Sequence, residues 1–326
     1  MQRRKFIKLI AAVAALPFTV RAQQRAMPIV GFINSESSNT YARFLDAFRQ
    51  GLRQKGFIEG RNVVVKYRWG ENDNIKTDDF IAEFVRLPVD AIVTTGGDRI
   101  VLQASAATKA IPVIANFGSD PVETGLIKSI NRPGGNVTGV SVFSIQLVAK
   151  RLELARDLTE TAALIAFLVN PDNPNSQIDV RELERAAKGI AQPVLPLRAS
   201  NESEFETVFT NLAQQGAKAL IVDSDPYFNS VSARLVALAR SHAIPTVFPR
   251  REFATAGGLM SYGSSLTEAY RQLGIYTGSV LKGDKPADLP FVLPTRFDLV
   301  VNLNTARSLG ITMPTGILLL ADEVIE

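Results

Sequence analysis

The chain has no cysteine among its 326 residues. This absence excludes disulfide bonds, thiolate metal sites, a cysteine nucleophile and the lipidated cysteine that would tether an exported protein to its membrane. After the first 22 residues, no apolar stretch approaches the roughly 20 residues that a membrane-spanning helix needs. We therefore expect a soluble, globular body without a membrane anchor.

The motifs of common enzyme classes are missing as well. The chain has no G-x-S-x-G elbow, no G-x-x-x-x-G-K-[ST] loop and no G-x-G-x-x-G after a predicted strand. Its single histidine, His242, ends a predicted helix just before Pro245, where a positive charge favours the helix dipole. A capping role is therefore favoured over catalysis. We predict no enzymatic activity, no cofactor and no metal site.

Residues 1–22 have the composition of an export signal. A basic head that contains Arg3 and Arg4 precedes an apolar run from Leu9 to Val20, and Ala22 supplies a small residue for cleavage. The order Arg-Arg-x-Phe-Ile-Lys resembles a twin-arginine signal, although the same layout serves the general secretory route. We predict that the mature chain begins at Gln23 and is located in the periplasm.

The overall basic charge comes largely from this segment. Residues 1–22 hold five of the 36 Lys and Arg residues and none of the 32 Asp and Glu residues, so the mature chain has a net charge of about −1. An electrostatic case for binding nucleic acid or an anionic membrane is therefore absent. We expect neither partner.

The first half of the mature chain alternates predicted strands with helices. Residues 28–34 form an apolar run typical of a strand buried on both faces of a parallel sheet, and apolar residues at helical spacing follow up to Gly56. Further strands are predicted at 63–69, 90–95 and 112–117. Helices between parallel strands imply right-handed crossovers and a doubly wound sheet.

The second half repeats this pattern. A predicted strand at 164–170 ends on Asn170, as the first strand ends on Asn34, and a polar loop and a helix follow each. Later strands are predicted at 217–223 and 245–248. Between the halves, Pro133 and two glycines interrupt helical structure and lead into an alternating strand at 136–142.

We predict an α/β fold of two Rossmann-like lobes with parallel sheets, joined by a hinge of three strands. Lobe 1 comprises residues 23–140 and 262–292, and lobe 2 comprises residues 141–261 and 293–326. The three crossings fall at 136–141, at 258–263 and in the extended run at 291–303. Several crossings between rigid lobes form a hinge about which a cleft can close on a ligand.

Four segments together resemble a known family. They are residues 120–126, 133–141, 256–263 and 281–290. The chain resembles the substrate-binding proteins of ABC importers, in the group that includes tryptophan- and tyrosine-binding members. The resemblance implies a periplasmic binding protein of type I, with delivery of a small ligand to an inner-membrane permease. Asp98 and Arg99 stand where this group usually has small residues or proline, which allows a ligand other than a simple aromatic amino acid.

The residues themselves also predict a binding site. In doubly wound sheets, ligands bind beyond the carboxyl ends of the strands, where helix starts present unpaired amides. Hydroxyl groups and glycine amides there suit a carboxylate, acidic groups suit an ammonium, and aromatic rings suit an apolar group. The candidate residues are Asn34, Ser35, Ser37, Thr95, Gly96, Gly97, Ser119, Asp120, Ser141, Asn173, Asp223, Asp225, Tyr227, Phe248 and Tyr262.

This set suits an amino acid, an aromatic one included, or a small organic acid. An aspartate before a proline is equally suited to capping a helix, so ligand binding and capping both stay open for Asp120 and Asp225. We predict a monomer that serves as the binding component of an ABC importer. A periplasmic ligand sensor that docks on a receptor is the alternative. A transcriptional repressor is not expected, because the export signal occupies the place of a DNA-binding headpiece.

Overall fold

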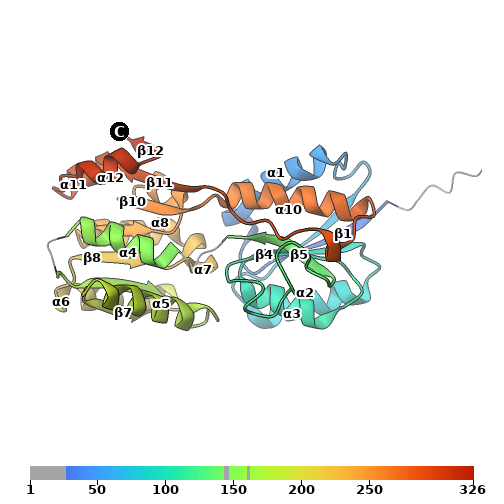
Figure 1. The fold of residues 1–326 in the computed structure, drawn as a ribbon, viewed down its shortest axis with the longest axis horizontal. Coiled ribbons are helices and arrows are strands. Elements are labelled where there is room, and N and C mark those ends of the chain that lie inside the picture. Colours follow the sequence, from blue (N-terminus) through green and yellow to red (C-terminus); the bar gives the residue numbers. More distant parts are fainter. Residues whose placement is uncertain (1–26, 143–146, 160–161) are drawn as a thin grey trace, which may run out of the picture.

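The chain folds into two α/β lobes that lie side by side (Figure 1). The computed structural model describes residues 27–142, 147–159 and 162–326. The signal peptide predicted at residues 1–22, with its twin-arginine pattern, lies outside the described residues. Each lobe is built on one sheet, with helices on both faces.

The first lobe is built on a five-stranded parallel sheet in the order β2-β1-β3-β4-β5. Its strands are β1 (Ile29–Asn34), β2 (Val64–Trp69), β3 (Ala91–Thr95), β4 (Val113–Phe117) and β5 (Val137–Ser141). Its helices are α1 (Ser38–Gln54), α2 (Asn74–Arg86), α3 (Asp98–Ala107) and, from later in the chain, α10 (Leu266–Leu281) and the 3-10 helix η2 (Pro286–Asp288).

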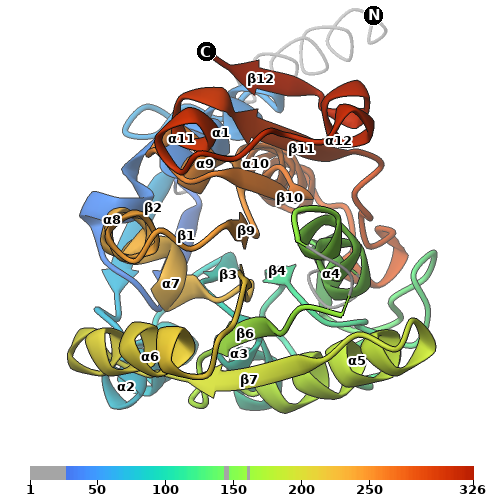
Figure 2. The ribbon, with the colours of Figure 1, turned by 90° about the vertical axis from the view of Figure 1, so that its left-hand side faces the viewer.

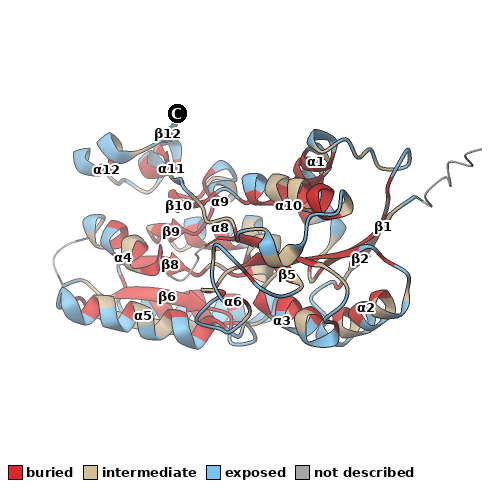
Figure 3. Ribbon diagram, turned by 45° about the vertical axis from the view of Figure 1, so that its right-hand side comes forward, coloured by how far each residue is buried: buried red, intermediate tan, exposed pale blue. Residues whose placement is uncertain are grey.

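Alternating side chains of β1 contribute to two separate cores. Val30 and Phe32 pack with residues of α1 and α10, whereas Ile33 packs with residues of α2 and α3 on the other face. All three side chains are fully buried. Figure 3 shows the central strands buried between helices whose outer faces are exposed. Burial on both faces explains why this strand is an uninterrupted apolar run.

Helix α10 follows the second lobe in the chain but packs against α1 in the first (Figure 1). The two helices approach closely at Gly51 and Gly274. A Cβ atom at Gly51 would collide with the carbonyl oxygen of Arg271, and one at Gly274 would collide with the carbonyl oxygen of Phe48. The two glycines therefore bring the helix backbones together and fix α10 to the first lobe.

The second lobe is built on a seven-stranded sheet in the order β12-β11-β10-β9-β8-β6-β7, from β7 at one edge to β12 at the other (Figure 2). Its strands are β6 (Ile165–Val169), β7 (Val194–Arg198), β8 (Ala219–Val222), β9 (Thr246–Phe248), β10 (Met260–Ser264), β11 (Phe297–Asn302) and β12 (Glu323–Ile325). Its helices are α4 (Val148–Asp157), α5 (Ser176–Gly189), α6 (Glu202–Gln214), α7 (Pro226–Ser230), α8 (Ser232–Ser241), α9 (Arg251–Thr255), α11 (Leu303–Ser308) and α12 (Thr315–Leu320).

Strands β6 to β10 repeat the order of β1 to β5. In each lobe the first strand lies between the second and third, and the fourth and fifth continue the sheet. Only β10 and β11 pair in antiparallel fashion among the described strand pairs. This follows from the chain path, because β10 leads out of the second lobe toward α10 and β11 returns from the first lobe.

The chain crosses between the sheets after β5, between β10 and α10, and between η2 and β11. Backbone hydrogen bonds join the first and third crossings, from Ser141 N to Val292 O and from Val292 N to Gly139 O, both at 2.8 Å. The hydroxyl of Ser264 donates to Val142 O at 3.1 Å and so joins the second crossing to the first. The three crossings therefore lie side by side.

The predicted fold class of two α/β lobes with mostly parallel sheets is confirmed. The predicted lobe boundary between residues 261 and 262 falls inside β10, which pairs along its whole length in the second sheet. The true boundary lies after β10, but no change in hydropathy marks it, because β10 is largely buried along its whole length. No helix in the described parts of the chain is long and apolar enough to cross a membrane.

Candidate functional site

Two adjoining cavities lie between the lobes, at loops that follow the carboxyl ends of strands in both sheets. The Arg250 cavity has a volume of about 40 Å³ and is lined by Tyr41, Gly96, Gly97, Asp98, Asn116, Gly118, Val142, Asn173, Asn175, Ser224, Pro226, Asn229, Arg250 and Leu266. The Glu36 cavity has a volume of about 80 Å³ and is lined by Ser35, Glu36, Asn72, Asn74, Thr77, Gly96, Gly97, Asp98, Arg99, Ile100, Asn170, Asp172, Asn173, Pro174, Asp225, Pro226 and Tyr227. Residues of both lobes line each cavity, so together the two form an interlobe cleft.

Arg250 is the buried cation of this cleft. Its guanidinium donates to Ser264 O at 3.3 Å and to Ser224 Oγ at 3.4 Å, while its Nε has no hydrogen-bond partner. Burial lowers the pKa of Arg250 below its ordinary value, although the group stays charged. A carboxylate is the group that this geometry accepts, since it would supply the missing hydrogen bond and a counter-charge.

Glu36 lies across the cleft in the loop after β1. The residue is 3% exposed, and its carboxyl group accepts a 3.1 Å hydrogen bond from the hydroxyl of Ser35. Burial, with a further contribution from the charge of Asp225, raises the pKa of Glu36 to about 7. A protonated amine in the cavity would stabilise the charged form of this group.

Asp225 joins the cleft from the second lobe. It accepts hydrogen bonds from Asn170 Nδ2 at 3.2 Å, from Asn173 Nδ2 at 2.9 Å and from the backbone amide of Phe228 at 3.0 Å. Burial raises the pKa of Asp225 to about 6. The residue therefore caps α7, which is one of the two roles left open by the sequence, and it also lines the Glu36 cavity.

Asp98 joins the two lobes. It accepts hydrogen bonds from Gly118 N at 2.6 Å and from Ser119 N at 2.9 Å in its own lobe, and from Asn175 Nδ2 of the second lobe at 2.8 Å. Ser119 Oγ also donates to Asn175 Oδ1 at 2.9 Å. Tyr41 makes a further interlobe contact, from its hydroxyl to Pro226 O at 3.4 Å. The described arrangement is therefore a closed one.

Gly97 permits this closure. Its φ of 113° belongs to the left-handed region that side chains disfavour, and a Cβ atom there would lie only 3.2 Å from Cγ of Pro226 in the other lobe. Any larger residue would strain the loop and press against the opposite wall of the cleft.

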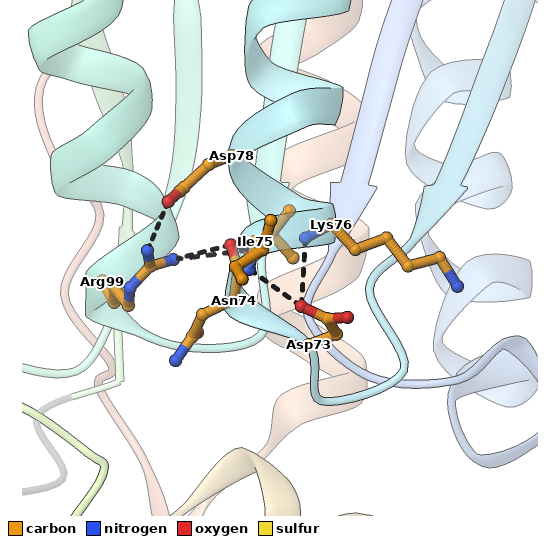
Figure 4. Close-up of polar contacts among 7 residues, drawn as sticks. Asp73, Asn74, Ile75, Lys76, Asp78 and Arg99 are labelled. Carbon is orange, nitrogen blue, oxygen red and sulfur yellow. Dashed lines mark hydrogen bonds and ion pairs between the residues drawn. The ribbon is translucent and has the colours of Figure 1, made fainter.

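Arg99 forms part of the rim, where Figure 4 shows it beside the start of α2. It pairs with Asp78 at 2.6 Å and donates to Thr77 Oγ1 at 3.3 Å and to Asn74 O at 3.5 Å. Asp73 caps the same helix by accepting from two backbone amides. Arg99 is thus held against α2, whereas its neighbour Asp98 lines both cavities.

Nine of the predicted site residues lie in or directly behind the cleft. Those that line a cavity are Ser35, Gly96, Gly97, Asn173, Asp225 and Tyr227. Behind the lining, Asn34 donates to Thr95 Oγ1 at 2.8 Å and to Tyr270 OH at 2.9 Å, and its own Oδ1 accepts from Glu36 N at 2.7 Å. Asn34 and Thr95 thus position the loop of Glu36, as Ser119 positions Asp98.

Other predicted residues lie elsewhere. Asp120 caps its own turn, with Val122 N at 2.7 Å, and Ser37 lies at the start of α1 with its hydroxyl 3.2 Å from that of Thr40. Ser141 lies at the crossing after β5, where its backbone amide binds Val292 O. None of the three lines either of the two cavities described above.

Two aromatic candidates belong to the cores. Phe248 is fully buried and stacks on Phe253, with ring centroids 4.8 Å apart. Tyr262 packs against Phe297 at 6.3 Å. Side chains of a strand alternate between faces, and at these positions they point into helix-covered faces of the sheet rather than beyond its edge.

Asp223 lies beneath the cleft, in a buried cluster with Arg151 and Asp179. Burial raises the pKa of Asp223, although the positive charge of Arg151 favours its ionised form. Burial and the neighbouring Asp223 raise the pKa of Asp179. Asp179 therefore keeps its proton and shares a hydrogen bond with Asp223. This cluster supports the loop that carries Ser224 and Asp225.

Sequence reasoning did not select Glu36, Arg250 or Asn175. Glu36 lies between two selected residues, Ser35 and Ser37, and Arg250 lies two residues after the end of β9. The rule that ligands bind at the carboxyl ends of strands applies to both positions. The only local signal for Glu36 and Arg250 is a charge in a loop after a strand. This signal is weak, because most charged residues in loops are solvated.

Residues 29–325 match the family model described as ABC transporter substrate binding protein. A tyrosine-binding protein of Clostridioides difficile (strain R20291) is 29% identical over 266 residues, which cover 80% of this chain and 75% of that protein. These matches extend over nearly all of the described chain.

Solved structures share the fold. An ABC domain from Streptococcus pneumonia, solved in complex with L-Trp, has a TM-score of 0.82 and 26% identity, with 91% of this chain and 99% of that chain covered. A conserved domain protein from Vibrio cholerae has a TM-score of 0.83 and 22% identity over the same shares of the two chains. With its two-lobed architecture and its interlobe cleft, the chain belongs to the family of ABC transporter substrate-binding proteins.

Proposed function

We propose that this chain is the periplasmic binding component of an ABC importer and that it captures an amino acid by closure of the two lobes. The observation that carries the proposal is the convergence of opposite charges in one cleft. Arg250 offers an unpaired Nε to a carboxylate, and Glu36 and Asp225 offer carboxyl groups to an amine. An α-amino acid has both groups bonded to one carbon atom.

The relatives support this class of ligand. One is named as a tyrosine-binding protein, and another was solved in complex with L-Trp. Two tyrosines, Tyr41 and Tyr227, line the cleft of this chain and provide aromatic surface for a ligand side chain. Aromatic amino acids are therefore the first ligands to test.

Export and delivery follow from the same proposal. The basic and apolar composition of residues 1–22 supports export to the periplasm, and the family supports an ABC permease as the partner. Three adjacent crossings support rotation of the lobes as rigid bodies, because packed cores resist internal change. A monomer suffices for this role.

Calorimetric titration tests the function. Mature protein, unfolded and refolded to remove any bound compound, is titrated with L-tyrosine, L-tryptophan, L-alanine and a panel of small organic acids. We expect saturable binding of at least one amino acid at one site per chain. Binding of organic acids alone would refute an amino-acid ligand, and chemical turnover of a bound compound would refute a binding protein.

A further inference from the structure

Two acidic residues from opposite lobes line the same cavity of the cleft. Glu36 belongs to the loop after β1 of the first lobe, and Asp225 belongs to the loop after β8 of the second. Both line the Glu36 cavity, and their exposed fractions are 3% and 2%. Lobe closure therefore removes two acidic groups from water together, which is costly if both are charged.

In the described parts of the chain, no basic side chain forms an ion pair with either of these two groups. Among the ion pairs of the described residues, none includes Glu36 or Asp225. Asp225 receives its hydrogen bonds from neutral amides, and Glu36 receives one from the hydroxyl of Ser35. Neutral donors reduce the cost of burying a carboxylate but leave its charge in place.

The other groups around Glu36 do not neutralise it. Tyr41, Tyr227 and Tyr270 lie near enough that the charge of Glu36 contributes to raising the pKa of each phenol. Arg250 favours the ionised forms of Tyr41 and Tyr270, yet the groups that shift the pKa of Glu36 are Asp225, Ser35 and Ser230. Arg99 lines the same cavity, but its guanidinium pairs with Asp78 at 2.6 Å and is not among the groups that shift the pKa of Glu36. Positive charge is therefore available at Arg250, whereas no cation among the described residues pairs with Glu36.

Unpaired polar atoms in the adjoining cavity indicate that a ligand completes the site. Arg250 Nε has no partner, although the residue is only 7% exposed, and neither does Asn116 Oδ1 in a residue that is 9% exposed. Both residues line the Arg250 cavity, which shares Gly96, Gly97 and Asp98 with the Glu36 cavity. Buried donors and acceptors normally have hydrogen-bond partners, so we infer that a polar ligand supplies the partners of these two atoms.

We propose that Glu36 and Asp225 form a charge gate, in which the closed cleft requires a positive charge between the two carboxyl groups. This inference rests on the proposed function and narrows its ligand to compounds that carry a protonated amine. A ligand that carries only a carboxylate would pair with Arg250, but the carboxylates of Glu36 and Asp225 would still repel each other. The gate thereby couples closure of the lobes to the presence of the correct ligand.

Protons act on the same gate. In the closed, ligand-free cleft the pKa of Glu36 is about 7, compared with 4.5 for an ordinary glutamate. Closure of the empty cleft therefore takes up a proton, and acidification from about pH 8 to about pH 5 shifts the ligand-free protein toward the closed form. At the higher pH, repulsion between the carboxylates favours the open form.

Small-angle scattering of the ligand-free mature chain tests the gate without any ligand. We expect a smaller radius of gyration at about pH 5 than at about pH 8. Glu36→Gln should give the smaller radius at both pH values, because its neutral amide removes the repulsion. Asp225→Asn provides a second variant, since asparagine caps a helix nearly as well as aspartate. Glu123→Gln, at an exposed residue of the first lobe, is the matched control.

The chemistry of the ligand provides an independent test. L-Tyrosine is compared with tyramine, which lacks the carboxylate, and with 3-(4-hydroxyphenyl)propionate, which lacks the amine. If tyrosine binds, we expect removal of the amine to weaken binding by at least roughly tenfold in the wild type, and by much less in Glu36→Gln. The same comparison is made with whichever amino acid binds best in the titration panel.

The outcomes separate the gate from the proposed function. Equal affinity for the amino acid and its deaminated analogue would overturn the gate and leave the binding function intact. If no amino acid binds, the proposed function fails, and scattering still decides whether the gate exists. A radius that is the same in wild type and Glu36→Gln at both pH values would overturn the gate.

Discussion

Asn175 of the second lobe donates a 2.8 Å hydrogen bond from its Nδ2 to Oδ2 of Asp98 in the first lobe. Its Oδ1 accepts a second interlobe bond from Ser119 Oγ at 2.9 Å. Asp98 also binds two backbone amides of its own lobe, so its carboxylate remains partly satisfied when the lobes separate. The Asn175 side chain therefore acts on the equilibrium between open and closed forms more than on folding.

Replacement of Asn175 tests this contact. We expect Asn175→Ala to lower ligand affinity by about 1 to 3 kcal/mol, since one of the two lost bonds involves a charged acceptor. The melting temperature of the ligand-free protein should change little. Asn211→Ala, at an exposed position of α6, serves as the control in the same titrations. An unchanged affinity in Asn175→Ala would show that the interlobe bonds do not stabilise the closed form.

Arg250 is expected to hold the ligand carboxylate. Arg250→Gln removes the charge but keeps hydrogen-bonding capacity, so we expect a loss of about 1.5 to 3 kcal/mol in amino-acid affinity. Tyramine lacks the carboxylate, and its affinity should hardly respond to the substitution. Arg185→Gln provides a control because that side chain is largely exposed on α5. If both ligands lose affinity equally in Arg250→Gln, the residue supports the cleft rather than the carboxylate.

The close contact between α1 and α10 should contribute to the stability of the protein. Gly274→Ala places a methyl group against the carbonyl oxygen of Phe48, which forces the helices apart. We expect a loss of about 1 to 3 kcal/mol in the free energy of unfolding, the usual cost of overpacking. Gly189→Ala is the control, because a Cβ atom there meets no atom within 4 Å. Chemical denaturation measures the stability of both variants. Equal unfolding midpoints for Gly274→Ala and Gly189→Ala would disprove close packing at Gly274.

The buried carboxyl pair beneath the cleft predicts a pH dependence of stability. Because burial and Asp223 raise the pKa of Asp179 in the folded state, unfolding at neutral pH releases a proton, and stability falls as pH rises above the ordinary value of 3.8. Asp179→Asn imitates the protonated acid, so it should remove the part of the pH dependence of stability that comes from Asp179. The stability of the variant relative to wild type should therefore increase as pH rises.

Denaturation at several pH values compares this variant with Asp284→Asn, an exposed control. The control should keep the slope of the wild type. A parallel slope in Asp179→Asn would mean that Asp179 is ionised in the folded protein and that Arg151 compensates both carboxylates.

Much of the fold could be predicted because local patterns determine it. The continuous burial of β1 and β6 appears in the sequence as apolar runs, and the loops after them are marked by polar residues. The boundary inside β10 could not be predicted, because a strand that leaves one lobe for another keeps the same burial along its length. Sheet order is a tertiary property, and no local pattern in the sequence determines it.

The sequence predicts which loops form the site better than it predicts which side chains line it. Ser35, Gly97 and Asp225 follow strands whose carboxyl ends meet at the cleft. The direction of Phe248 depends on which face of the sheet its strand presents, and helix packing decides that. The importance of Glu36 and Arg250 depends on their burial between two lobes, which no local pattern encodes.

A crystal structure of the mature chain grown with the amino acid that binds best shows directly whether the ligand lies between the two lobes. We predict density for the ligand in the interlobe cleft, with its carboxylate at Arg250 and its amine between Glu36 and Asp225. A ligand bound elsewhere, for example beside the crossings at Ser141 and Val292, would contradict the proposed binding mode, as would a ligand held within one lobe alone.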